Sequence, residues 1–134
     1  MYRWIDHTSE LELHIEAATE PAVFEDAARA LAELLERDEP TAVRGDPVTR
    51  EIVVEADDSA ALLAAWIEEL VFIAESDGVV PGRVHLEAVD ERGVRARVEG
   101  RRTDPPHLVK AVTYHRLSME PADGGWRATV VLDV

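Results

Sequence analysis

Beyond residue 78 the chain carries strand patterns only, and both of its helical patterns lie before that point. Four stretches of the second half are extended, mostly with alternating apolar and polar residues: 83–90, 94–100, 109–120 and 126–133. Such alternation is typical of strands with one buried face. The turn sequence Asp90-Glu91-Arg92-Gly93 predicts a hairpin between the first two. Helices gathered early and antiparallel hairpins gathered late predict an α+β fold rather than a doubly wound parallel sheet.

The first half supplies two strands and two helices in alternation. Residues 11–16 alternate strictly, with three aliphatic residues on one face and Glu12, His14 and Glu16 on the other. A second strand is predicted at 50–56. Apolar residues recur at three- and four-residue spacing from Thr19-Glu20-Pro21 to about Arg37, and again from Asp57-Asp58-Ser59 to about Glu75; both stretches predict helices, the second ending at Asp77-Gly78. Breaks are predicted at Pro40, Gly45 and Pro47, and a loop at Thr103-Asp104-Pro105-Pro106.

Length and charge limit what the chain can do. It has 134 residues without a linker, a repeat or a low-complexity segment, which predicts one domain over residues 1–134. Fourteen basic residues stand against 28 acidic ones, so the net charge is −14. Such a surface disfavours strong direct binding to nucleic acid or to anionic membranes, and it suits hard cations or a basic protein partner. With no signal peptide and no membrane-spanning stretch, a cytoplasmic location is expected.

Candidate chemistry lies at both ends of the chain. Residues 6–10 hold two carboxylates, an imidazole and two hydroxyls in a predicted loop before the first strand, a composition that usually serves local turn structure. Residues 110–115 have the composition of an ordinary strand. The last predicted strand stays β-competent to Val134, which fixes the α-carboxylate beside Asp133. Phosphate-loop, HExxH, CxxC and nucleophile-elbow patterns are all missing.

Taken together, these segments resemble the archease family. The resemblance rests on a tryptophan followed by Asp6-His7-Thr8-Ser9-Glu10, on WIEEL in the second helix, on VKAVTYH at 109–115, and on the terminal Asp133-Val134. It implies a strand-helix-strand-strand module with an inserted antiparallel set. It also implies a non-enzymatic partner of RtcB-type RNA ligases, which join RNA ends in tRNA splicing and RNA repair. The family protein promotes guanylylation of the ligase and its multiple turnover.

The resemblance also implies a divalent-metal site formed by Glu10, Asp133 and the carboxylate of Val134. The family usually has aspartate at the position of Glu10, and a Gly-containing strand start where this chain has Leu11-Glu12-Leu13. An all-oxygen site without cysteine favours a hard cation, Ca²⁺ first and Mg²⁺ or Mn²⁺ next. Additional site or partner contacts are expected from the following residues: Asp6, His7, Lys110, Tyr114 and His115.

Two other functions use the same carboxylates. A metal-dependent small-molecule enzyme could use His7 or His115 as its acid or base. A general protein-binding modulator or chaperone would hold the ion for structure only. A ligase guanylylation assay with and without the protein separates the first function from these two.

Overall fold

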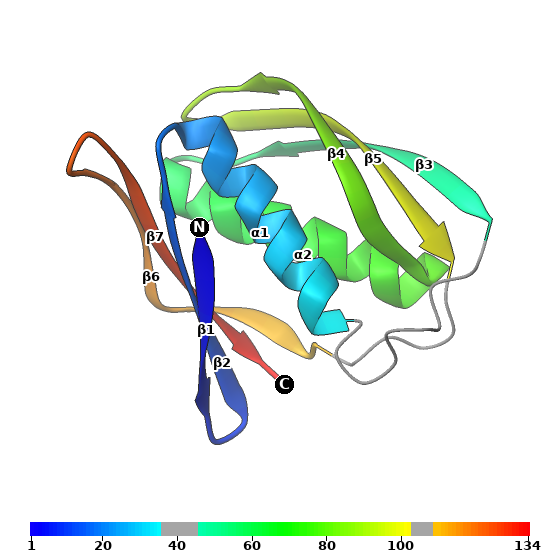
Figure 1. The fold of residues 1–134 in the computed structure, drawn as a ribbon, viewed down its shortest axis with the longest axis horizontal. Coiled ribbons are helices and arrows are strands. Elements are labelled where there is room, and N and C mark those ends of the chain that lie inside the picture. The colour runs from blue at the N-terminus through cyan, green and yellow to red at the C-terminus, as the bar shows by residue number, and fades with distance from the viewer. Residues whose placement is uncertain (36–45, 103–108) are drawn as a thin grey trace.

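The computed structural model describes residues 1–35, 46–102 and 109–134, which form two helices and two antiparallel sheets (Figure 1). One sheet has four strands in the order β1-β2-β7-β6, and the other has three in the order β3-β5-β4. The elements are β1 (Tyr2–His7), β2 (Glu10–Ala17), α1 (Glu20–Leu35), β3 (Pro47–Glu55), α2 (Ser59–Asp77), β4 (Val79–Val89), β5 (Gly93–Arg102), β6 (Ala111–Ala122) and β7 (Gly125–Asp133). The α+β class predicted from the sequence is confirmed.

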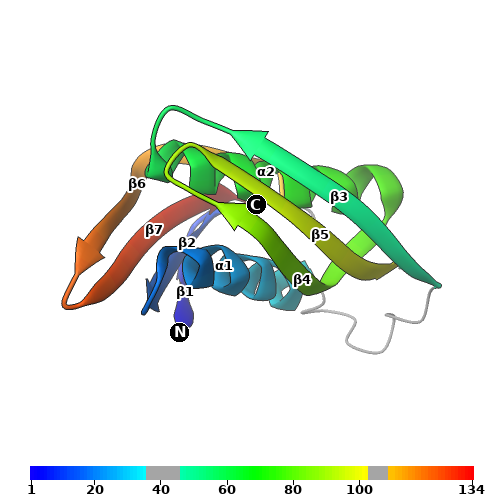
Figure 2. The ribbon, with the colours of Figure 1, turned by 90° about the horizontal axis from the view of Figure 1, so that it is seen from above.

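The helices pack between the two sheets (Figure 2). Helix α1 contacts β2 and β7 on one side and β4 on the other, and α2 contacts β6 as well as all three strands of the smaller sheet. Trp66 of α2 is fully buried, and its indole Nε1–H donates to the carbonyl oxygen of Phe24 in α1 at 3.0 Å. The two rings meet edge to face, with centroids 6.2 Å apart. This pair joins the two helices at the centre of the core.

The predicted helix ends are confirmed by their capping contacts. The Thr19 hydroxyl accepts from the backbone N–H of Ala22 at 3.3 Å, and the Asp58 carboxylate accepts from that of Ala61 at 2.8 Å. Gly78 closes α2 with φ 66°, a left-handed conformation that favours glycine. Cap chemistry is local, and for this reason the sequence is sufficient to place these boundaries.

Several boundaries differ from the sequence prediction. Residues 6–10 are predicted as a loop, but Asp6 and His7 belong to the edge strand β1, which pairs with β2. Its alternation is hidden because Ile5 projects to the same face as Arg3, away from the core. Pro47 begins β3 instead of ending a loop, and β4 begins at Val79, earlier than residue 83. The expected breaks at Pro40 and Gly45, the helix end near Arg37 and the loop Thr103–Pro106 lie outside the described residues.

Neither α1 nor α2 is long and apolar enough to cross a membrane, and the described residues contain no other helix.

Candidate metal centre

The pairing of β2 with β7 brings the two ends of the chain together. Glu10 lies directly opposite Asp133, and the same line across the sheet continues to His7 in β1 and to Ala111 in β6. Directly opposed residues project to one face with their Cβ atoms about 5 Å apart. Because the neighbouring Leu11 is in the core, this face is the one turned away from the helices. We call it the outer face, and we call Glu10 and Asp133 the carboxylate row.

Backbone hydrogen bonds fix both ends of this row. The N–H of Val134 donates to the carbonyl oxygen of Ser9 at 3.1 Å, and the N–H of Lys110 donates to that of Asp133 at 2.8 Å. Ser9 sits in the β1–β2 turn with φ 61°. The final strand therefore keeps its pairing up to its last residue, as its sequence predicted, and Asp133 has a fixed backbone position.

Glu12 lies one step further along the outer face, opposite Val131. It is 8% exposed, which is unusual for a carboxylate on the polar face of a strand. The Nε2 atom of His14 lies 2.7 Å from Oε2 of Glu12. This hydrogen bond is the main reason that the pKa of Glu12 falls below its ordinary value; burial opposes the shift, and the Arg116 guanidinium adds to it. Glu12 is thus held as a carboxylate.

Arg116 of β6 contacts both Glu10 and Glu12. Its Nη2 lies 3.0 Å from Glu12 Oε1 and 3.6 Å from Glu10 Oε2. The 3.0 Å contact is an ion pair without hydrogen-bond geometry, so Glu12 Oε1 has no hydrogen-bond donor among the described residues. Neither role follows from the sequence pattern. Alternation places Glu12 on a polar face, and nothing marks Arg116, which directly follows the VKAVTYH segment.

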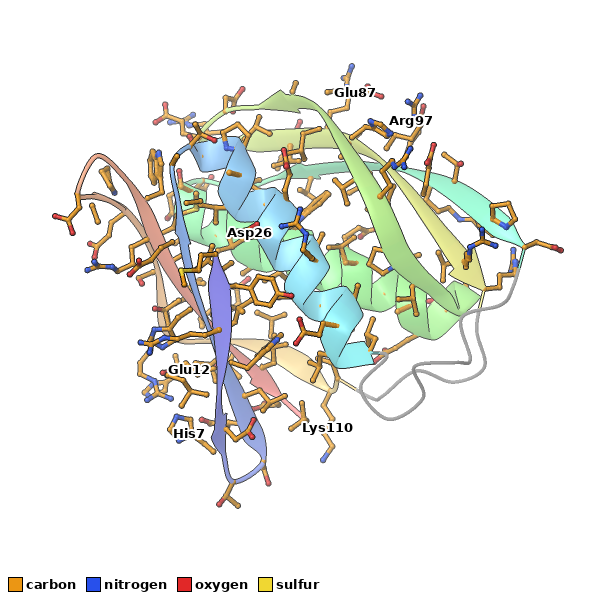
Figure 3. The ribbon with its side chains drawn as sticks, viewed as in Figure 1. His7, Glu12, Asp26, Glu87, Arg97 and Lys110 are labelled. Atoms are coloured by element: carbon orange, nitrogen blue, oxygen red, sulfur yellow. The ribbon has the colours of Figure 1, made fainter. Side chains whose placement is uncertain are left out.

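The other predicted residues differ in their position relative to the carboxylate row. His7 is exposed and lies in line with the carboxylate row, whereas Asp6 pairs with Leu11 and so projects to the opposite face. In Figure 3 the Lys110 side chain extends apart from His7 and Glu12. Tyr114 and His115 are exposed in an irregular part of β6. The structure therefore brings His7 to the row and leaves Asp6 and Lys110 away from it.

The donor set suits a hard cation that keeps several of its waters. Among residues 1–35, 46–102 and 109–134, no three His, Asp or Glu side chains come together as a metal-binding group. The row itself offers two carboxylates, and Val134, next to Asp133, would add a third if its α-carboxylate turns the same way. Mg²⁺ and Ca²⁺ accept such partial oxygen sets and complete them with water.

Comparisons with known proteins agree with this architecture. A model of the Archease protein family matches residues 2–134. The protein archease of Methanosarcina mazei is 31% identical over 142 residues, covering 99% of this chain and 95% of that protein. The one from Methanopyrus kandleri is 34% identical over 140 residues, covering 97% and 96%.

Two solved structures have the same fold. The solution structure of a Methanobacterium thermoautotrophicum protein superposes with a TM-score of 0.73 at 26% identity, covering 99% of this chain and 98% of that one. A Thermotoga maritima protein, described as an archease and possible chaperone, superposes with a TM-score of 0.67 at 19% identity, covering 100% and 98%. A family match over nearly the whole length, with relatives above 30% identity, leaves one conclusion. The chain belongs to the Archease protein family.

Proposed function

We propose that this protein is a non-enzymatic cofactor that activates an RtcB-type RNA ligase, promoting its guanylylation and its multiple turnover in tRNA splicing or RNA repair. The family match over residues 2–134 is the observation that carries the proposal. The net charge of −14 supports it, because an acidic protein is attracted to the basic surface with which a ligase binds RNA. Such a partner also implies a cytoplasmic location.

We further propose that Glu10, Asp133 and the α-carboxylate of Val134 hold a divalent cation, with Ca²⁺ first and Mg²⁺ or Mn²⁺ as alternatives. The direct pairing of Glu10 with Asp133 supports this assignment, since ligands of one ion must lie within a few ångströms of each other. Glutamate at position 10 keeps the charge of the usual aspartate and adds one methylene of reach. When bound, the cation would supply a concentrated positive charge at an otherwise acidic edge of the sheet.

The outer face is suited to presenting this site to a partner. His7 lies beside the row on this face, and Tyr114, in the irregular part of β6, is 61% exposed although it is large and aromatic. Exposed aromatic residues of this kind are enriched where proteins bind one another. We propose that His7, Tyr114 and His115 contact the ligase around its metal- and nucleotide-bearing site. Asp6 and Lys110 would contact it from the opposite side of the sheet end.

A metal-dependent small-molecule enzyme is a second candidate, because an imidazole stands in line with two carboxylates. General acid-base catalysis needs such a group within reach of a bound substrate. A protein-binding chaperone is the third, as the description of the Thermotoga maritima relative suggests for that protein. Neither alternative predicts an effect on nucleotide transfer to a ligase.

The test is a guanylylation assay on the RtcB-type ligase of the same organism, with and without this protein. We expect the protein to raise the rate of ligase guanylylation by more than about tenfold, which corresponds to about 1.4 kcal/mol of activation free energy. Substoichiometric amounts should suffice for multiple turnover. Glu87→Gln is the matched control, because it removes one exposed carboxylate from β4 of the other sheet. Equal rates with and without the protein would contradict the proposal.

A further inference from the structure

Arg116 occupies a backbone conformation that arginine rarely adopts. Its φ is 59°, and it lies where the pairing of β6 with β7 jumps from Thr113 to Ser118. Bulges of this kind redirect a side chain that regular alternation would place elsewhere. A left-handed conformation in a residue other than glycine costs of order 1 kcal/mol or more, and it persists only where other contacts hold it. The guanidinium of Arg116 contacts two carboxylates of β2.

The guanidinium contacts two carboxylates, one more buried and closer than the other. Glu12, whose side chain is 10% exposed, faces Nη2 at 3.0 Å with an oxygen that no described donor satisfies. Glu10, whose side chain is 36% exposed, lies 3.6 Å from the same nitrogen. The shorter contact is to the more buried carboxylate, so Glu12 is the anchor. The longer contact reaches a residue of the carboxylate row.

We propose that Arg116 is a tethered counter-ion of the carboxylate row that competes with a divalent cation for Glu10. The inference rests on the cation site proposed above. In the metal-free protein the guanidinium offsets the repulsion between Glu10, Glu12 and Asp133. A divalent cation that binds Glu10 takes over that contact, and Glu12 keeps the displaced guanidinium close by. The remaining repulsion between guanidinium and cation lowers cation affinity, so Arg116 sets the concentration at which the site fills.

Calorimetric titration of the full chain with Ca²⁺ alone tests this proposal. Arg116→Asn removes the charge and keeps a residue that tolerates positive φ. We expect it to bind Ca²⁺ about tenfold more tightly than the unchanged protein, the order expected when a unit charge near a dication is removed at a partly exposed site. Arg116→Lys keeps the charge and should stay within about threefold of the unchanged affinity, a change of under 1 kcal/mol.

Arg127→Gln is the matched control. Arg127 pairs with Glu16 and Asp123 at the far end of β7, so its loss changes the net charge equally without touching the row. At moderate salt its effect should be under about twofold, because the separation exceeds a Debye length of about 10 Å. Melting curves in EDTA confirm beforehand that each variant is folded.

Unchanged or weaker Ca²⁺ binding by Arg116→Asn would overturn the proposal, as would an equal gain in Arg127→Gln. Absence of binding in every protein would overturn it as well. The titration contains no ligase, and this separates it from the proposed function. A tenfold gain together with no ligase activation would contradict the function alone, whereas activation without the gain would contradict the role of Arg116 alone.

Discussion

Replacing Asp133 by alanine is expected to abolish activation of the ligase while the metal-free protein stays at least as stable as before. The carboxylate of Asp133 makes no hydrogen bond or ion pair with another described residue, and its structural contacts come from its backbone. Glu10 lies directly opposite it in the sheet and repels it when no cation is present. Removing it therefore relieves repulsion, but it also takes a charged oxygen from the proposed cation.

Melting curves in EDTA and guanylylation assays on the same protein samples measure the two effects. Glu87→Ala, with one acidic charge removed from the other sheet, should keep full activation. Activation by Asp133→Ala within about twofold of the unchanged protein, less than 0.5 kcal/mol in activation free energy, would contradict a role for this carboxylate. A large fall of its melting temperature in EDTA would show instead that Asp133 is structural.

The pairing that creates the candidate site could not be derived from sequence periodicity. Alternation identifies β2 and β7 as strands, but it does not say that residue 10 meets residue 133 across almost the whole chain length. Local patterns describe contacts within a few residues, whereas sheet order depends on how the helices cover both sheets. The family resemblance supplied this proximity, and the register then showed that His7 is in line with the row and Asp6 is not.

The positions of Arg116 and Glu12 beside the carboxylate row were harder to predict. A bulge in β6 brings Arg116 to Glu12, and neither Tyr114 nor His115 carries a turn signal that marks it. Bulges add a residue without a fixed sequence signature, and every alternation-based assignment beyond them is shifted. Arg116 of the bulge contacts one carboxylate oxygen of Glu12, and His14 of β2 contacts the other. The alternation pattern alone predicts that Glu12 is exposed to solvent.

The helix ends illustrate the opposite case. Thr19, Asp58 and Gly78 act within five residues of their own position, through hydrogen bonds and one backbone angle. Their roles do not depend on the fold around them, so they could be predicted. The edge strand β1 could not be predicted for the converse reason. Ile5 faces outward and pairs with Glu12, a placement that only the neighbouring strand explains.

Replacing Trp66 by alanine is expected to lower the free energy of unfolding by about 3–5 kcal/mol. Trp66 is fully buried between the helices, so its loss removes the edge-to-face contact with Phe24 and leaves a cavity where both helices meet. The indole hydrogen bond to the Phe24 carbonyl is lost as well. A domain of this size has about 5–15 kcal/mol in total, so stability and ligase activation should fall together near physiological temperature.

Urea unfolding with a common m-value measures the loss, and α2 itself supplies the control. Phe72 lies on the same helix but is 60% exposed, so Phe72→Ala should cost less than about 0.5 kcal/mol. A loss below about 1 kcal/mol in Trp66→Ala would mean that the helices do not depend on this contact, since cavities at such sites cost several times more. The comparison with Asp133→Ala separates the two causes. In Trp66→Ala, activity is lost because the protein unfolds. In Asp133→Ala, the protein stays folded and activity is lost because one carboxylate is missing.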